Sequence, residues 1–229
     1  MFELDDSWGT SFPGAHAGFL VVRGVANPPR HPALQERKQA LQTELRVRYA
    51  GMDRAALQAL PRIQAYTAYY RRFGKSYHVL GQLESVALKG RDLPSVSALV
   101  EAMFMAEVAD LLLTAGHDLA ALEPPVTVRA ATGAESYVTL RGQEQPLRAG
   151  DMMMQDGRGV VSSVLYGPDQ RTRITAETAG VLFAVYAPAG IETGAVREHL
   201  ERILDYARLF SPGSRAEDIR ILGSEKGHA

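Results

Sequence analysis

The chemistry-bearing residues of this sequence concentrate in residues 69–78, which read YYRRFGKSYH. Arg71 and Lys75 are four residues apart, so they share a face of a helix, and Arg72 lies beside them. Tyr70 and its aromatic neighbours accompany these cations. Cations that hold phosphates, next to rings on which bases stack, are typical of sites for single-stranded nucleic acid. The stretch therefore predicts a surface that binds nucleic acid. The alternative is that the rings face the core and the arginines only line the solvent side.

A second pair of cations, Arg171 and Arg173, lies on either side of Thr172. In a strand, both guanidinium groups would point to the same face. Two parallel guanidinium groups bind phosphates or a carboxylate. The pattern is equally typical of ion pairs with Asp169 or Glu177 nearby.

His117 and Asp118 follow a glycine that ends a helical pattern. As neighbours at a cleft they would act as a general base and the group that orients it. The alternative is that Asp118 caps a short helix that starts at Leu119. The six histidines are widely separated, and no phosphate-binding or zinc-protease motif is present, so we expect no metal and no cofactor.

The net charge of −1 conceals an asymmetry. Residues 21–91 hold 13 Lys and Arg against 4 Asp and Glu, whereas residues 92–229 hold 12 against 19. Such a difference indicates contact with a polyanion, or two halves that pack together and neutralise each other.

The 229 residues include no cysteine, which excludes disulfides and thiolate chemistry. The acidic N-terminal segment does not resemble a signal peptide, and no apolar run approaches the ~20 residues of a membrane span. We therefore expect a cytoplasmic protein with no membrane partner.

The elements that must position these residues follow from periodicity and turn signals. A β-branched run predicts a strand over 14–25, and four helical segments follow between 33 and 90. Residues 97–113 form the most apolar segment, which predicts a central helix that ends at Gly116. After Pro125, short strands alternate with turns, and residues 192–210 predict an amphipathic helix. This order is typical of an α+β fold, with an antiparallel sheet or sandwich packed against several helices.

The sequence resembles the B3/4 domain of the phenylalanyl-tRNA synthetase β chain, especially in its stand-alone form, over about residues 65–210. The motifs that carry the resemblance are Tyr70-Arg71-Arg72-Phe73-Gly74, Lys89-Gly90, Leu93-Pro94, Leu99-Val100-Glu101, and Thr175, Thr178, Val181 and Leu182. It implies an α+β fold with a β-sandwich and a partner that is an RNA, above all a tRNA. It divides the chain into an N-terminal strand and helices (1–64), a B3/4-like domain (65–210) and a polar tail (211–229).

In the synthetase this domain hydrolyses tyrosine that is wrongly attached to tRNA. The positions that match its histidine, its glutamate and its Thr-Asn pair hold Ala120, Ala184 and Met103-Phe104 here. The resemblance therefore implies an RNA-binding protein in which the synthetase's editing residues are lost. The polar and apolar groups that remain for a pocket are Phe104, Ser162, Ser163 and Thr175. Two alternatives stay open: a hydrolase that acts on misacylated tRNA, with the aminoacyl group as its second partner, and a protein that binds a free amino acid.

Overall fold

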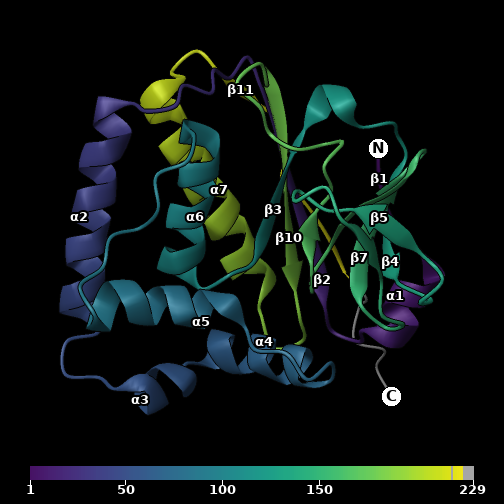
Figure 1. Cartoon of the computed structure of the whole chain (residues 1–229), viewed down its shortest axis with the longest axis horizontal. Helices are drawn as coiled ribbons and strands as arrows, with labels where there is room; N and C mark the ends of the chain where they lie inside the picture. Colours follow the sequence, from purple (N-terminus) through teal and green to yellow (C-terminus); the bar gives the residue numbers. More distant parts are fainter. Residues whose placement is uncertain (218, 224–229) are drawn as a thin grey trace.

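The computed structural model describes residues 1–217 and 219–223. Two antiparallel or mixed sheets lie side by side, and most of the helices gather on the outer side of one of them (Figure 1). This arrangement confirms the α+β fold class. Phe2 and Phe19, one from each sheet, stack with their ring centroids 4.4 Å apart, so the space between the sheets is part of the core.

The first sheet, which we call the helix-covered sheet, has the order β11-β2-β10-β3, with β12 also paired to β2. All of its pairings are antiparallel. Its strands are β2 (His16–Arg23), β3 (Thr114–Asp118), β10 (Gly180–Ala187), β11 (Arg215–Ala216) and β12 (Arg220–Gly223). The two central strands, β2 and β10, are buried along almost their whole length. Apolar runs of this kind are typical of strands that are covered on both faces.

The second sheet has the order β1-β4-β7-β8-β9. Only the β1–β4 pair is parallel. Its strands are β1 (Phe2–Leu4), β4 (Val126–Ala130), β7 (Met152–Asp156), β8 (Gly159–Ser163) and β9 (Gly167–Pro168). A separate hairpin, β5 (Ser136–Val138) and β6 (Glu144–Pro146), extends from it.

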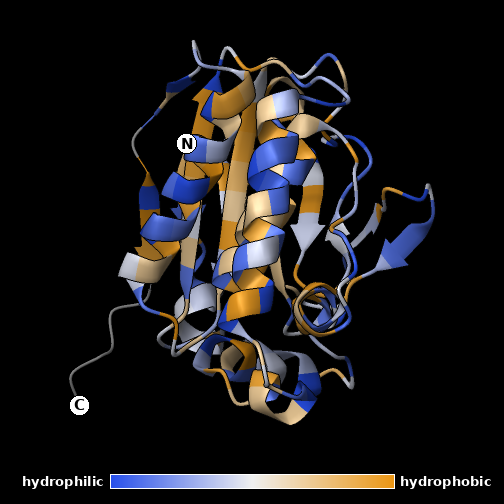
Figure 2. Cartoon of the chain, turned by 90° about the vertical axis from the view of Figure 1, so that its left-hand side faces the viewer, coloured by the Kyte–Doolittle hydropathy of each residue, from blue (hydrophilic) through white to orange (hydrophobic). Residues whose placement is uncertain are grey.

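Helices α6 (Ala98–Asp110) and α7 (Thr193–Phe210) pack on the helix-covered sheet, and α2 (Pro32–Arg48) lies outside these two helices (Figure 1). The apolar side chains of α7 are buried, as the sequence predicted. The outer side of the helical layer shows mainly hydrophilic residues, which are blue in Figure 2. The shorter segments are α1 (Asp6–Ser11), α3 (Arg54–Gln58), α4 (Pro61–Arg71), α5 (His78–Leu83), a π-helical turn (Glu84–Leu88) and a 3₁₀ turn (Leu119–Ala121).

The central helix is shorter than the sequence predicted. It ends at Asp110, and Leu111 adopts a left-handed conformation with φ 61° and ψ 35°. This conformation stops the helix, so residues 114–118 form strand β3 instead of a helical end. The prediction of a helix up to Gly116 is therefore wrong.

Two further segments differ from expectation. Residues 171–179 form turns and loop, so the strand predicted around Arg171 and Arg173 is absent. Within the C-terminal segment, β11 and β12 pair with β2 and extend the sheet. The last residues of the predicted polar tail, 224–229, and residue 218 lie outside the described residues.

Candidate functional site

A cavity of about 650 Å³ lies between helix α6, strand β3 and the segment that joins β8 to β9. Its wall is mainly apolar, with Met103 and Phe104 from α6 and Ile174 from the loop before β10. Val96 and Leu140, both of which are exposed, also belong to the lining. A concave, mostly apolar cavity with a few polar groups is the usual form of a site for a small ligand or an apolar side chain.

Strand β3 approaches the cavity without a side chain at Gly116. A Cβ added there would lie 2.7 Å from Cδ1 of Ile174 and 3.4 Å from Sδ of Met103. A larger residue would therefore require the ends of the Ile174 and Met103 side chains to shift.

Glu107 is one of the polar residues of the cavity wall. Its Oε1 accepts a hydrogen bond from the Thr114 N–H at 2.8 Å. Burial raises the pKa of the Glu107 carboxyl to about 8, although the Thr114 hydrogen bond acts in the opposite direction. Glu107 is therefore mainly protonated at neutral pH and acts as a neutral hydrogen-bonding group.

Sequence reasoning did not select Glu107. The available signal was its position as one of three acidic residues in an otherwise apolar helix. A buried carboxyl with a raised pKa in a cavity is typical of functional sites.

Of the residues expected in a pocket, Phe104 and Ser163 lie in the cavity wall. Ser162 is fully buried behind it and hydrogen-bonds the hydroxyl of Tyr186, which is itself a wall residue. Thr175 lies outside the wall, where its hydroxyl accepts a hydrogen bond from the Glu177 N–H.

Of the cations of residues 71–75, Lys75 contacts the wall of this cavity. Arg71 and Arg72 are exposed, and neither they nor Lys75 form an ion pair with any carboxylate in the described residues. The Nζ of Lys75 lies 4.6 Å from the ring centroid of Tyr166, and Tyr166 is part of the cavity wall. Arg148 is exposed nearby and donates to the Phe73 carbonyl at 2.6 Å. We call Arg71, Arg72, Lys75 and Arg148 the cationic cluster.

The rings of this stretch face inward. Tyr70 is 3% exposed, and its hydroxyl donates to the Val164 carbonyl at 2.8 Å. Tyr66 and Tyr77 stack in the core with their ring centroids 4.3 Å apart. The expectation that Tyr70 offers a surface for stacking bases is therefore wrong, because helix α4 turns its tyrosines toward the sheets. Arg71, Arg72 and His78 remain exposed, and Lys75 is partly exposed.

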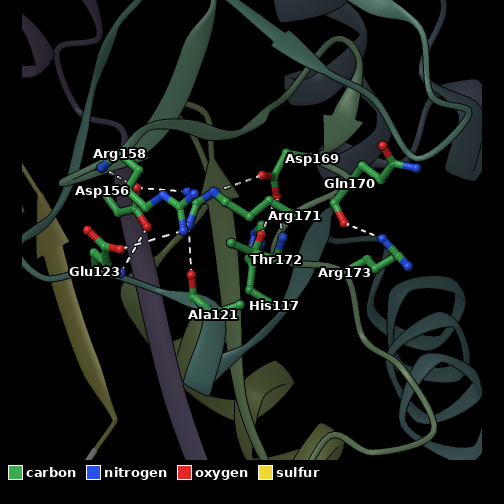
Figure 3. A network of polar contacts seen from close by, with 10 residues as sticks. All are labelled: His117, Ala121, Glu123, Asp156, Arg158, Asp169, Gln170, Arg171, Thr172 and Arg173. Carbon is green, nitrogen blue, oxygen red and sulfur yellow. Dashed lines mark hydrogen bonds and ion pairs between the residues drawn. The ribbon is translucent and has the colours of Figure 1, made fainter.

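His117 and Asp118 have separate structural partners. His117 is fully buried, and its Nδ1 lies 2.7 Å from Oγ1 of Thr172 (Figure 3). The Thr172 hydroxyl donates to Asp169, so it accepts from the imidazole N–H. Burial and the positive charge of Arg171 lower the pKa of His117 to about 3.

Asp118 caps the 3₁₀ turn by accepting from the Ala120 N–H at 2.9 Å. Successive residues of a strand point to opposite faces, so the two side chains do not meet. Neither belongs to the cavity wall. The predicted base-and-orienter pair is thus absent, and the capping alternative holds for Asp118.

Arg171 and Arg173 point in different directions (Figure 3). Arg171 forms ion pairs with Asp156 at 2.8 Å and Asp169 at 3.7 Å, and it donates to the Ala121 carbonyl at 2.6 Å. Arg173 is exposed, donates to the Gln170 carbonyl at 2.8 Å and lines the cavity. Since no strand forms here, the expected parallel guanidinium pair is not present, and only Arg173 is available to a ligand.

Two absences concern the described part of the chain only. No three His, Asp or Glu side chains in residues 1–217 and 219–223 are arranged to hold a metal ion. In the same ranges, no helix is long and apolar enough to cross a membrane.

Comparison with known proteins identifies relatives of this fold. The family model of the B3/4 domain matches residues 68–210. Among solved structures, the chain is similar to an N-terminal fragment of the phenylalanyl-tRNA synthetase β-subunit from Pyrococcus horikoshii, with a TM-score of 0.50 and 13% identity. The alignment covers 94% of this chain and 50% of that fragment, so the chain spans half of its length. No curated protein matches the sequence.

Proposed function

Because this chain belongs to the B3/4 domain family, as its motifs indicated, we propose that it is a tRNA-binding protein that holds the acylated end of the RNA. The acyl group enters the cavity, and the phosphates nearest to it lie on the cationic cluster. The fold's similarity to a fragment of a tRNA synthetase supports an RNA partner only by analogy, so the site must carry the argument.

The observation that carries this proposal is the contact between Lys75 and Tyr166. It joins the cationic cluster directly to the wall of the cavity, at 4.6 Å from ammonium to ring centroid. A ligand that combines negative charge with an apolar group would contact both features at once. An acylated RNA end has this composition, because an apolar acyl group lies within a few bonds of a phosphate.

The lack of carboxylate partners for the cationic cluster supports the same proposal. Of the described residues, no carboxylate forms an ion pair with any member of the cationic cluster. Arg72 instead lies 5.5–5.9 Å from the centroids of Phe12, Tyr69 and Phe73, which fix its position without neutralising it. Charges that are held in place but not neutralised are suited to bind phosphates.

The test is the salt dependence of tRNA binding. The variant Arg71→Glu/Arg72→Glu/Lys75→Glu is compared with a matched control, Arg197→Glu/Arg208→Glu/Arg215→Glu, which makes the same change in net charge at exposed positions outside the cluster. We expect the first variant to lose affinity and to flatten the slope of log K against log salt by about 0.7–0.9 for each lost phosphate contact. The proposal is overturned if the two variants behave alike.

The apolar lining also supports a second candidate, a protein that binds a free apolar amino acid. The neutral carboxyl of Glu107 would then hydrogen-bond a polar group of the ligand. Calorimetric titration with amino acids, in the absence of RNA, separates the two: saturable binding of one amino acid by a protein that does not bind tRNA favours this second candidate.

A further inference from the structure

The carboxylate of Asp151 lies between helix α4 and the segment that joins β8 to β9, and the residue has no exposed surface. Its Oδ1 accepts a hydrogen bond from the hydroxyl of Tyr69, on α4, at 2.5 Å. Its Oδ2 accepts from the Leu165 N–H at 3.4 Å, and Leu165 belongs to the cavity wall. One buried carboxylate therefore joins the helix that ends at Arg71, a member of the cationic cluster, to the wall of the cavity.

Tyr69 connects this carboxylate to the cations. Burial and the neighbouring charge of Asp151 raise the pKa of Tyr69 well above its usual value, so the shared proton stays on the tyrosine. The same hydroxyl accepts from the Met152 N–H at 2.6 Å, which fixes its orientation. The guanidinium carbon of Arg72 lies 5.7 Å from the centroid of the Tyr69 ring. The position of Arg72 therefore depends on a ring that Asp151 holds in place.

Ser163 and Tyr166 extend the network along the cavity wall, to which both belong. The Ser163 side chain forms a hydrogen bond that favours the ionised form of Asp151. Oγ of Ser163 also accepts from the Tyr166 N–H at 3.2 Å. Tyr166 carries the ring that Lys75 contacts. Both parts of the proposed site, the cations and the cavity wall, are thus connected to the same carboxylate.

The geometry around Asp151 suits an ionised carboxylate, because the groups that hydrogen-bond to it act as donors. Burial raises the pKa of Asp151 to about 6, although the hydrogen bonds from Tyr69, Ser163 and Leu165 act in the opposite direction. The carboxyl is therefore mainly ionised at neutral pH and mainly protonated at pH 5. A protonated carboxyl has an O–H donor in place of one acceptor site, so it no longer satisfies all of these donors.

The other titratable groups that face Asp151 are tyrosines, and burial raises the pKa of each of them away from the range near 6. They are Tyr69 and Tyr70 from α4, Tyr137 from β5 and Tyr186 from β10. Among residues 1–217 and 219–223, no cation forms an ion pair with Asp151. Nη2 of Arg72 lies beside the preceding residue, at 3.6 Å from the position that a Cβ on Gly150 would take. Asp151 is therefore the group of this network that titrates near pH 6.

We propose that Asp151 is a positioning residue that holds the cationic cluster and the cavity wall in the relative position in which one ligand contacts both. This role rests on the proposed function and deepens it, because the ionisation of one carboxyl then regulates the combined site. Two connected contacts give more affinity than either alone only when the geometry lets the ligand reach both. The hydroxyl of Tyr70 keeps its own bond to the Val164 carbonyl in either state, so protonation shifts the wall relative to the helix without separating them.

The first test needs no ligand. Hydrogen exchange of the full chain is measured by mass spectrometry at pH 7.5, where Asp151 is ionised. Tyr69→Phe removes one hydroxyl from α4, and we expect exchange of the amides in residues 163–166 to become about fivefold faster, because their acceptor network has lost a donor that orients it. Tyr77→Phe is the matched control. It removes a buried hydroxyl that donates to the Leu111 carbonyl, so exchange in residues 163–166 should stay the same.

The second test measures the preference for an acylated RNA end. The ligands are an uncharged tRNA and the same tRNA carrying N-acetylleucine through an amide bond, and the ratio of their dissociation constants cancels effects of pH on the RNA itself. In the unmodified chain we expect this ratio to fall from about tenfold at pH 7.5 to about one at pH 5.

Asp151→Asn imitates the protonated carboxyl, since an amide has a donor in place of one acceptor group. We expect a ratio of about one at both pH values, with the affinity for uncharged tRNA retained. Asp205→Asn, which makes the same change at an exposed position of α7, is the matched control and should follow the unmodified chain. Melting temperatures are measured in parallel, and Tyr69→Phe replaces Asp151→Asn if the latter does not fold.

The outcomes separate this role from the proposed function. A preference for the acylated tRNA that is the same in the unmodified chain and in Asp151→Asn, or that does not change between pH 7.5 and 5, overturns the positioning role and leaves the function. Unchanged exchange of residues 163–166 in Tyr69→Phe overturns it as well. If the unmodified chain binds no tRNA, the proposed function fails, and the combined site that Asp151 is proposed to regulate fails with it, even where exchange shows that the network holds the wall.

Discussion

Nη2 of Arg171 donates to Oδ1 of Asp156 at 2.8 Å, and the Asp156 side chain is completely buried (Figure 3). The pair ties the loop before β10 to the end of β7. Arg173, two residues away, has no such partner in the described residues and only donates to the Gln170 carbonyl. Two arginines of one short segment therefore have different roles, one structural and one available at the cavity.

The first prediction concerns this pair. Arg171→Met leaves two buried carboxylates without their counter-ion, so we expect the free energy of unfolding to fall by about 3 kcal/mol. Arg173→Met, the matched control, should change it by less than about 0.5 kcal/mol. Urea unfolding at pH 7 measures both. Equal effects of the two substitutions would contradict the structural role of Arg171.

The second prediction concerns the protonation of Glu107. Its pKa is raised to about 8 in the folded chain, so the folded state binds a proton that the unfolded state has released. The free energy of unfolding must then fall as pH rises toward 8, by up to about 1.4 kcal/mol per pH unit. The histidines whose folded pKa is lowered act in the opposite direction near pH 6.5, because there the unfolded state binds the protons. They contribute equally to a variant that changes Glu107 alone, so a comparison with such a variant isolates the effect of Glu107.

Glu107→Gln tests this directly, because an amide cannot ionise and its oxygen still accepts from the Thr114 N–H. We expect a flatter profile of stability against pH between 6.5 and 8, and higher stability than the unmodified chain at pH 8. Denaturant unfolding at several pH values provides the measurement. Parallel profiles for the two proteins would show that Glu107 is ionised.

The third prediction concerns His117, whose pKa is lowered to about 3 by burial and by Arg171. A lowered histidine pKa makes the unfolded state bind the extra proton, so stability is lost as pH falls from about 6.5 toward 3. In His117→Asn the amide N–H still reaches Thr172 but cannot titrate. The difference in unfolding free energy between the two proteins should change with pH in that range, in favour of the variant at low pH. A difference that is constant with pH would contradict the prediction.

Much of the fold could be predicted because local patterns and tertiary packing agree. The apolar face of the last helix, with Val196, Leu200 and Ile203, is a stripe at helical spacing, and all three residues are buried. The order of helices before strands gave the α+β class. The motifs around Tyr70 and Leu182 identified the family over nearly the same range that the family model matches.

The turn at Leu111 could not be predicted in the same way. Leu111, Leu112 and Leu113 are three apolar residues in a row, and such a run fits a buried helix and a buried strand equally well. The left-handed residue that separates α6 from β3 is not a glycine, so the usual signal for a helix end was missing.

The candidate site could be predicted from the sequence even less well than the turn at Leu111. Lys75, Glu107 and Tyr166 come from three separate segments and are brought to one site only by tertiary packing, so no spacing along the chain reveals them. For residues 69–78 the composition showed cations and rings together but not which face turns inward. The fold buries the three tyrosines and leaves Arg71 and Arg72 exposed.

The central claim is that the cavity and the cationic cluster hold one ligand, and one measurement tests it most directly. The ligands are an uncharged tRNA and the same tRNA carrying an apolar amino acid through an amide bond, which hydrolyses much more slowly than an ester. The proteins are the unmodified chain and Val100→Trp, which fills the cavity from α6. Dissociation constants are measured at one fixed salt concentration.

We expect the acylated tRNA to bind the unmodified chain at least about tenfold more tightly, a difference of about 1.4 kcal/mol. In Val100→Trp this preference should disappear while the affinity for uncharged tRNA stays the same. Equal dissociation constants of the acylated and uncharged forms with the unmodified chain would contradict the claim.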